Sequence, residues 1–190
     1  MDKLVIHGGK TISGSVEMSG AKNAILPLMA ATLLVEGKST IGRVPDLRDT
    51  RTFLCLLDII GAHSVFMDSK LTIDASNITS FEAPYDLVKT MRAGILVLGP
   101  MLAKYGNAKV STPGGCSIGV RPIDIHLKAL SKLGANYKIV DGYVYAYSRK
   151  KLKGANIRFP KISVGATENL IIASSMAEGT TILSNCAISF

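Results

Sequence analysis

Tryptophan is absent from the sequence, and aromatic residues of all kinds make up only 6% of it. Such a chain has few rings on which nucleic-acid bases could stack, which disfavours binding to single strands. Acidic residues are also in short supply, with 14 against 22 basic ones, so the net charge is +8. The resulting field favours an anionic partner without selecting one. The one dense basic run, residues 149–153, is interpreted as a solvated loop, and no nucleic-acid partner is expected.

Cysteine is scarce, and its three copies, Cys55, Cys116 and Cys186, lie far apart with no Cys-x-x-Cys pair. This number and spacing exclude a disulfide framework and indicate no zinc-type site, so no metal is expected. A reducing, cytoplasmic compartment follows as the default. Cys55 stands among apolar residues 53–57 and is predicted to be a small core residue.

Long hydrophobic runs are missing as well. The most apolar stretch, residues 24–35, is interrupted by Pro27 and is far shorter than the roughly 20 residues that a membrane helix needs. Residues 1–6 do not resemble the start of a signal peptide. No membrane association is expected, whereas 190 residues of which 47% are hydrophobic can bury a sizeable core.

The chain instead contains a degenerate internal repeat of about 72 residues. Residues 60–62 align with residues 133–135, each with a glycine that ends an apolar helical pattern. Each is followed by a predicted hairpin, residues 64–73 in the first unit and 137–145 in the second, with Asp-Ser and Asp-Gly turns.

A second pair of landmarks supports the same period. A helix is predicted after residues 19–21 and ends at Gly37, another is predicted after residues 164–166 and ends at Gly179, and residues 85–105 supply the middle one. Each unit therefore consists of a helix, a strand, a helix and two strands. The chain contains two full units and the first half of a third, an α/β (α+β) organisation that is expected to be truncated within the third unit.

Residues 113–122 join a predicted strand to a predicted helix and contain three glycines. Backbone N–H groups of such a loop and of the following helix start can surround an anion, although a plain turn fits equally well. Cys116 lies in this loop near Arg121, where positive charge would increase its thiolate fraction. The alternative is an incidental exposed thiol.

Lys22 opens a predicted helix, where a cation opposes the helix dipole, so an anionic ligand would explain it. Arg92 falls near the equivalent position in the second unit, and both cations could converge on one phosphate. Each could also be a solvated surface charge. Asp124 is either a carboxylate that stabilises a helix start or a ligand contact. The three histidines, His126 among them, are interpreted as structural.

Four segments together resemble the UDP-N-acetylglucosamine enolpyruvyl transferase family: residues 19–24, 83–93, 113–122 and 163–167. The resemblance extends from residue 1 to about residue 185. It implies the enolpyruvyl-transferase fold, in which each of two lobes contains three helix-and-strand units around a pseudo-threefold axis. Substrates bind between the lobes.

The resemblance also implies a set of functional residues. Cys116 would be the catalytic proton donor and the target of the epoxide antibiotic fosfomycin. Phosphoenolpyruvate would contact Lys22, Asn23 and Arg121. The UDP-N-acetylglucosamine site would be formed by Arg92, Arg121, Pro122, Ile123, Asp124, Ile125, Lys161, Ile162, Ser163 and Val164.

The reaction implied is the transfer of an enolpyruvyl group to the sugar 3-hydroxyl on the way to peptidoglycan, without metal or organic cofactor. Cys116 separates this family from the shikimate-pathway enolpyruvyl transferases, which lack the cysteine loop. In the family residues 1–19 belong to the second lobe, with a strand at residues 4–6, and residues 20–190 form an incomplete first lobe.

The family continues beyond the position of Phe190, and its second-lobe acid/base aspartate and phosphate-binding arginine have no counterpart here. A full-length member is expected to be a monomer, whereas this chain by itself is expected to be inactive and prone to associate through partly uncovered Ile171, Ile172, Ile182 and Leu183. Two other classes stay open. They are a nucleotide-sugar binding module without catalysis and a structural or nucleic-acid-associated domain.

Overall fold

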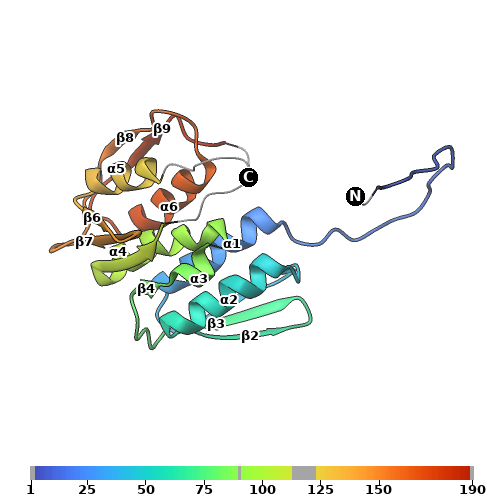
Figure 1. Ribbon diagram of the computed structural model, residues 1–190, viewed down its shortest axis with the longest axis horizontal. Coiled ribbons are helices and arrows are strands. Elements are labelled where there is room, and N and C mark those ends of the chain that lie inside the picture. The colour runs from blue at the N-terminus through green and yellow to red at the C-terminus, as the bar shows by residue number, and fades with distance from the viewer. Residues whose placement is uncertain (1–2, 90, 113–122, 189–190) are drawn as a thin grey trace.

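The computed structural model describes residues 3–89, 91–112 and 123–188, without the side chain of Arg92. Three small sheets lie around the outside of the body, and the helices lie between them (Figure 1). Each sheet belongs to one unit of the repeat, so the sequence period corresponds to a structural period.

The first unit forms a three-stranded antiparallel sheet with the order β1-β3-β2. Its elements are α1 (Lys22–Ala31), η1 (Thr32–Leu34), β1 (Lys38–Ile41), α2 (Arg48–Ile60), β2 (His63–Met67) and β3 (Lys70–Asp74).

The second unit forms a four-stranded sheet with the order β4-β5-β7-β6, in which β4 runs parallel to β5. Its elements are β4 (Glu82–Ala83), α3 (Tyr85–Val88), η2 (Arg92–Val97), α4 (Leu98–Tyr105), β5 (Asn107–Ser111), α5 (Asp124–Lys132), β6 (Asn136–Val140) and β7 (Tyr143–Tyr147).

The third unit has a parallel pair of strands and one helix. Its elements are β8 (Asn156–Arg158), α6 (Val164–Ser174) and β9 (Ile182–Ser184).

The predicted helix stops and hairpin turns are confirmed. Gly61 ends α2 with φ +105°, and a Cβ there would lie 2.7 Å from the carbonyl oxygen of Asn77, so both conformation and space demand glycine. Gly134 follows α5 with φ +100°. The turn residues Asp68 and Asp141 have φ +49°, as tight hairpin turns require.

Two strands and one helix break were not predicted. β4 and β8 are only two and three residues long, too short for a periodic signal. The single helix predicted over residues 85–105 is wrong, because α3, η2 and α4 are separate. Between η2 and α4, Gly99 N–H donates to the side chain of Asn169 instead of closing a helical turn on Ile95 O. A side chain inserted into the helical ladder is a known cause of such breaks.

The core lies where the helices of the three units meet. α1 packs against η2, and α4 packs against α6. In α2 the buried positions are Thr50, Phe53, Leu56, Leu57 and Ile60, which form one stripe of the helix. Cys55 lies on the opposite side and is exposed, so its prediction as a core residue is wrong.

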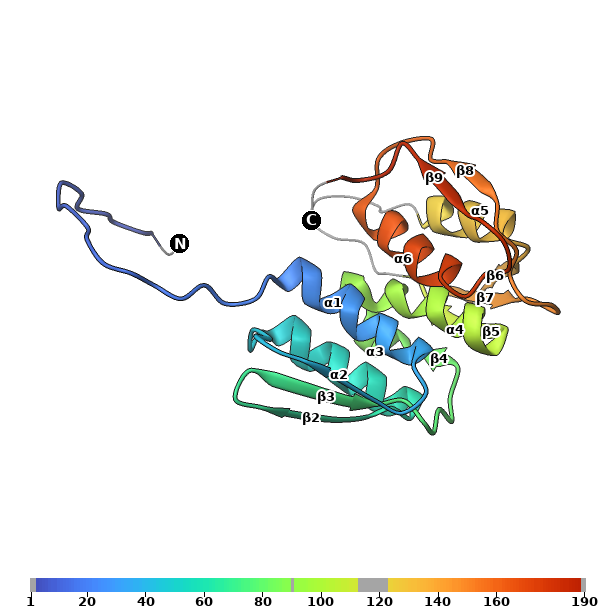
Figure 2. The ribbon, with the colours of Figure 1, turned by 180° about the vertical axis from the view of Figure 1, so that it is seen from behind.

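Residues 3–19 extend away from the body without regular structure (Figures 1 and 2). The strand predicted at residues 4–6 is not formed, because a strand needs a neighbour for its N–H and C=O groups. Leu4 is 86% exposed and Ile6 is 77% exposed. The body begins at Gly20, whose N–H donates to the carbonyl of Arg43 at 3.1 Å. Within the described residues no helix has the length and apolarity that a membrane crossing requires.

Candidate functional site

Four helices, α1, α2, α5 and α6, begin at the same end of the body, the end from which the N-terminal segment leaves (Figures 1 and 2). A helix start presents unpaired N–H groups and the positive end of the helix dipole. Several starts at one end favour an anionic ligand there. The predicted substrate-binding segments include the first residues of α1, α5 and α6.

The start of α1 presents Lys22 and Asn23, both exposed. The preceding residue, Ala21, offers no side chain that could cap the helix. Lys22 Nζ lies 2.5 Å from Asp49 Oδ2, in the first turn of α2. The charge of Lys22, which the sequence related to a ligand, therefore already has a carboxylate partner within the protein.

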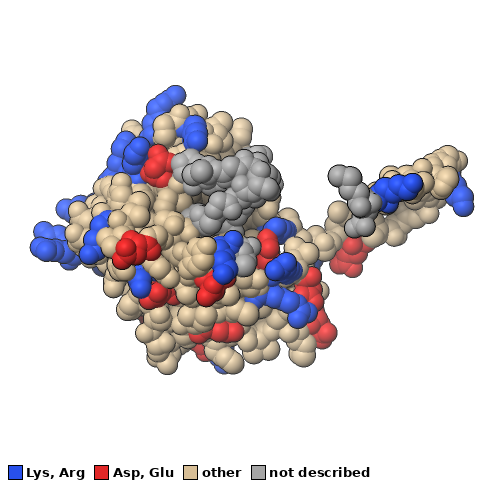
Figure 3. Space-filling model, in the orientation of Figure 1, with Lys and Arg blue, Asp and Glu red and all other residues tan. Residues whose placement is uncertain are grey.

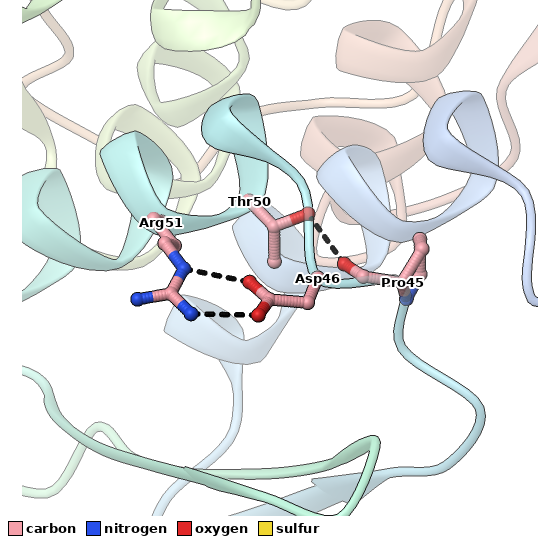
Figure 4. Close-up of polar contacts among 4 residues, drawn as sticks. All are labelled: Pro45, Asp46, Thr50 and Arg51. Carbon is pink, nitrogen blue, oxygen red and sulfur yellow. Dashed lines mark hydrogen bonds and ion pairs between the residues drawn. The ribbon is translucent and has the colours of Figure 1, made fainter.

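The loop before α2 is braced by polar contacts (Figure 4). Arg51 Nε and Nη2 each donate to one carboxylate oxygen of Asp46 at 2.6 Å. The hydrogen bond from Arg51 lowers the pKa of Asp46. Thr50 Oγ1 donates to the carbonyl of Pro45 at 3.1 Å, and Thr50 is fully buried. These contacts join the loop to the first turn of α2, which carries Asp49.

At the start of α5, Ile123 is the N-cap residue and is half-buried. Asp124 is exposed and forms an i,i+4 ion pair with Lys128 at 3.2 Å, as a carboxylate in a first helical turn commonly does. Ile125 is only 4% exposed and belongs to the core. Its side chain therefore cannot line a binding surface, and its contact with a ligand would have to come from the backbone.

At the start of α6, Ser163 is the N-cap residue, and its Oγ accepts a hydrogen bond from the Ala166 N–H at 3.3 Å. Lys161, Ile162 and Val164 are exposed beside it. Among the described residues, the N–H groups of Val164 and Gly165 have no hydrogen-bond partner. This helix start is capped and still offers two donors.

The structure brings some of the predicted residues together. A Cβ at Gly165 would lie 3.6 Å from His126 Cε1, so the starts of α5 and α6 are in contact. The start of α1 is joined to that of α2, and α1 packs on η2, which begins at Arg92. Cys116, Arg121, Pro122 and the side chain of Arg92 lie outside the described residues.

Three residues that the sequence did not single out for a site contact these segments: Asp49, His126 and Asn169. Asp49 carries no sequence signal that relates it to Lys22, because only packing of α1 on α2 joins them. In the described part of the chain, no group of three or more His, Cys, Asp and Glu residues could hold a metal ion. On the face shown in Figure 3, basic side chains stand in separate groups with acidic ones among them.

Comparisons with known proteins give one consistent set of relatives. Residues 6–190 match the family described as EPSP synthase (3-phosphoshikimate 1-carboxyvinyltransferase). The chain is 57% identical over 190 residues to a UDP-N-acetylglucosamine 1-carboxyvinyltransferase of Pelagibacter ubique, covering 99% of this chain and 45% of that protein. The enzyme of the same name from Prosthecochloris aestuarii is 53% identical, with the same coverage of both chains.

Solved structures share the fold. The enolpyruvyl transferase NikO from Streptomyces tendae superimposes with a TM-score of 0.78 at 24% identity, over 94% of this chain and 42% of that chain. EPSP synthase from Acinetobacter baumannii gives a TM-score of 0.72 at 20% identity, over 90% of this chain and 40% of that one. The chain thus spans less than half the length of the relatives that it matches.

Proposed function

Because this chain belongs to the EPSP synthase (3-phosphoshikimate 1-carboxyvinyltransferase) family, we propose that it is part of an enzyme that transfers an enolpyruvyl group from phosphoenolpyruvate to the 3-hydroxyl of UDP-N-acetylglucosamine. Its curated relatives at 57% and 53% identity carry the corresponding name. The product would be the first committed intermediate of peptidoglycan synthesis, which places the enzyme in the cytoplasm.

The observation that carries the proposal is the common end at which α1, α2, α5 and α6 begin (Figure 2). Both proposed substrates are anions, one with a phosphate and a carboxylate and the other with a diphosphate. Four helix starts supply N–H donors and positive potential where the predicted segments lie.

We assign roles to the residues by family resemblance. Phosphoenolpyruvate binds at Lys22 and Asn23 with Arg121, and the nucleotide sugar binds along residues 121–125 and 161–164 with Arg92. Cys116 donates the proton. The exposure of Lys22, Asn23, Asp124 and Val164 supports this assignment, whereas burial limits Ile125 to backbone contacts.

In the proposed reaction the sugar 3-hydroxyl oxygen forms a bond to C2 of phosphoenolpyruvate while C3 gains a proton from Cys116. The hydroxyl proton leaves to a base, and a tetrahedral ketal forms. Loss of a proton from C3 then restores the double bond as the C2–O bond to phosphate breaks. Enolpyruvyl sugar and inorganic phosphate are the products, and no redox partner is needed.

The 190 residues alone are proposed to bind ligand without turnover. More than half the length of the relatives has no counterpart in this chain, and closure of two lobes excludes water from sites of this kind. Residues 1–19 are proposed to pack on the second lobe, and the exposure of residues 3–19 supports this.

A chimera tests the function directly. Residues 1–190 are fused to the remaining part of the Pelagibacter ubique relative, and phosphate release is measured with both substrates. Turnover on the order of 1 to 1000 per second supports the proposal. The matched control is the same chimera with Cys116→Ala, which should release phosphate at least about a hundredfold more slowly, as expected for loss of a general acid.

The second candidate is a nucleotide-sugar binding module without catalysis. It predicts that the chimera binds UDP-N-acetylglucosamine but releases no phosphate, and that Cys116→Ala changes nothing. Release with shikimate 3-phosphate in place of the sugar would contradict the proposed substrate while keeping the reaction class.

A further inference from the structure

Asn169 is a fully buried polar residue in the middle of α6. Its Oδ1 accepts a hydrogen bond from Gly99 N–H at 2.8 Å, and its Nδ2 donates to Ile95 O at 3.0 Å. In an uninterrupted α-helix those two backbone groups would bond each other, since they stand four residues apart. The amide of Asn169 therefore bridges the break between η2 and α4 and joins both to α6.

Position 99, next to this amide, has room only for glycine. A Cβ at Gly99 would collide with Asn169 Oδ1 and lie 2.7 Å from the Asn169 carbonyl oxygen. α4 and α6 approach this closely only because residue 99 has no side chain. The two hydrogen bonds to Gly99 N–H and Ile95 O orient the Asn169 amide, which leaves its second Nδ2 hydrogen for another acceptor.

The second Nδ2 hydrogen of Asn169 points to His126, which is the third residue of α5. Asn169 Nδ2 lies 3.1 Å from His126 Nδ1. His126 is 6% exposed, and burial lowers its pKa to about 4, so the ring is neutral at physiological pH. An amide N–H can only donate, hence Nδ1 accepts and the hydrogen-bond network assigns the ring proton to Nε2. Nε2 faces Gly165, where a Cβ would be 3.8 Å away.

The ring of His126 thus lies between the middle of α6, through Asn169, and the first turn of α6, at Gly165. Its chain neighbours include Asp124 and Ile125, and the neighbours of Gly165 include Ser163 and Val164. We propose that His126, oriented by Asn169, is a positioning residue that sets the separation between residues 123–125 and 161–164, which belong to the two halves of the nucleotide-sugar site. This inference rests on the proposed function.

A purely structural role of His126 predicts a different relation between the stability of the fold and the affinity for the sugar. His126→Leu would leave one Asn169 Nδ2 hydrogen buried without an acceptor, which destabilises the fold, so a purely structural role predicts that affinity falls only as far as stability does. A positioning role predicts that His126→Leu lowers the free energy of sugar binding by more than it lowers the free energy of unfolding. Two variants separate these effects, because asparagine can present an acceptor near the place of Nδ1 and leucine cannot.

The experiment compares His126→Asn, His126→Leu and a matched core control, Leu71→Ala in the first sheet, all in the 190-residue chain. Leu71 is fully buried and remote from α5 and α6. Each variant is titrated with UDP-N-acetylglucosamine by calorimetry, unfolded with urea, and examined by ¹⁵N–¹H NMR at residues 123–125 and 163–165 without ligand.

His126→Leu is expected to weaken sugar binding at least tenfold and to shift the amide signals at both helix starts. His126→Asn should stay within about threefold of the original chain, and Leu71→Ala should lose stability with unchanged affinity and unchanged signals at those residues. An affinity that simply follows stability across the three variants overturns the inference, and so does His126→Leu with unmoved signals.

The experiment distinguishes failure of the proposed sugar binding from failure of the positioning role of His126. If the original chain does not bind the sugar but His126→Leu moves both sets of signals and Leu71→Ala moves neither, the binding proposed for these 190 residues is wrong and the positioning of the two helix starts stands. If the sugar binds equally well to all three variants, the function survives and the positioning role is refuted.

Discussion

Lys22 Nζ lies 2.5 Å from a carboxylate oxygen of Asp49, so an ion pair joins the first turns of α1 and α2. Both side chains are partly exposed, at 49% and 30%, so the pair contributes little to stability. The pair would instead affect binding, because an anion that used Lys22 would have to compete with Asp49.

Asp49→Asn is therefore expected to tighten phosphoenolpyruvate binding by about twofold to fivefold, which corresponds to less than about 1 kcal/mol for an exposed pair. Titration calorimetry at low salt measures the change. Asp46→Asn is the matched control, because it removes one negative charge three residues away, from the loop before α2, and its partner is Arg51, so Lys22 keeps its pair with Asp49. Weaker binding in Asp49→Asn would mean that Asp49 orients Lys22 instead of competing for it.

Cys116 is expected to react faster with small electrophiles than either of the other cysteines. Its sequence neighbours include Arg121, and positive charge raises the thiolate fraction. Cys55 is exposed on α2 and Cys186 is half-buried, so Cys55 serves as an internal control for accessibility alone. Mass mapping after limited alkylation, and after treatment with fosfomycin, decides the order. Faster labelling of Cys55 would remove the basis for Cys116 as an activated thiol.

Arg121→Ala is expected to weaken UDP-N-acetylglucosamine binding much more than Lys153→Ala does. A charge aimed at a ligand from about 4 Å is worth about 4 kcal/mol at an effective dielectric of about 20, before desolvation is subtracted. Lys153 is exposed in the basic loop, where a single charge has far less effect. Equal losses in a calorimetric comparison would indicate diffuse attraction rather than a defined site.

The stability of the fold should decrease on acidification between pH 6.5 and about 4. Burial lowers the pKa of His126 from 6.5 to about 4, with a small opposing effect of Asp124. The unfolded chain therefore binds a proton in this range that the folded chain does not, and the folded state loses about 3 kcal/mol relative to it. Above pH 6.5 this contribution is fully present.

Urea unfolding of the original chain and of His126→Asn across this range isolates the contribution. Burial raises the pKa of Glu168, which favours the folded state at low pH and acts in the opposite direction. Because Glu168 is present in both chains, its effect cancels in the comparison. Parallel stability curves for the two chains would show that His126 does not titrate as its burial predicts.

Self-association of the 190-residue chain is expected through the third unit. Ile171 is 48% exposed on α6 and Ile182 is 55% exposed on β9. The prediction that Ile172 is uncovered as well is wrong, since it faces the core and is 7% exposed, and Leu183 is half-buried. Exposed apolar surface of this kind favours association.

Light scattering of the chain and of the double variant Ile171→Lys, Ile182→Lys tests this expectation. The double variant should have the mass of a monomer at concentrations where the original chain is larger. Val65→Lys is the control, because Val65 is 53% exposed on β2 in a complete sheet. An equal effect of Val65→Lys would show that added charge alone prevents association.

Features that depend on a few consecutive residues could be predicted from the sequence. Gly61 and Gly134 end helices because the backbone there is left-handed, and the Asp-Ser and Asp-Gly turns close hairpins for the same reason. The repeat follows from the recurrence of these local signals. The family resemblance likewise rests on short segments whose order alone is specific.

Features that depend on which surfaces meet could only come from the tertiary structure. Whether the face of α2 that carries Cys55 is covered depends on what packs against it, and the structure leaves that face exposed although the sequence neighbours of Cys55 are apolar. The break between η2 and α4 has a local contribution, because Pro100 lacks an N–H and disfavours helical backbone at Gly99. Only the tertiary structure, however, supplies the amide of Asn169, 70 residues after Gly99, in place of a helical hydrogen bond. Asp49 reaches Lys22 in the same way, because the first turns of α1 and α2 meet only when the two helices pack.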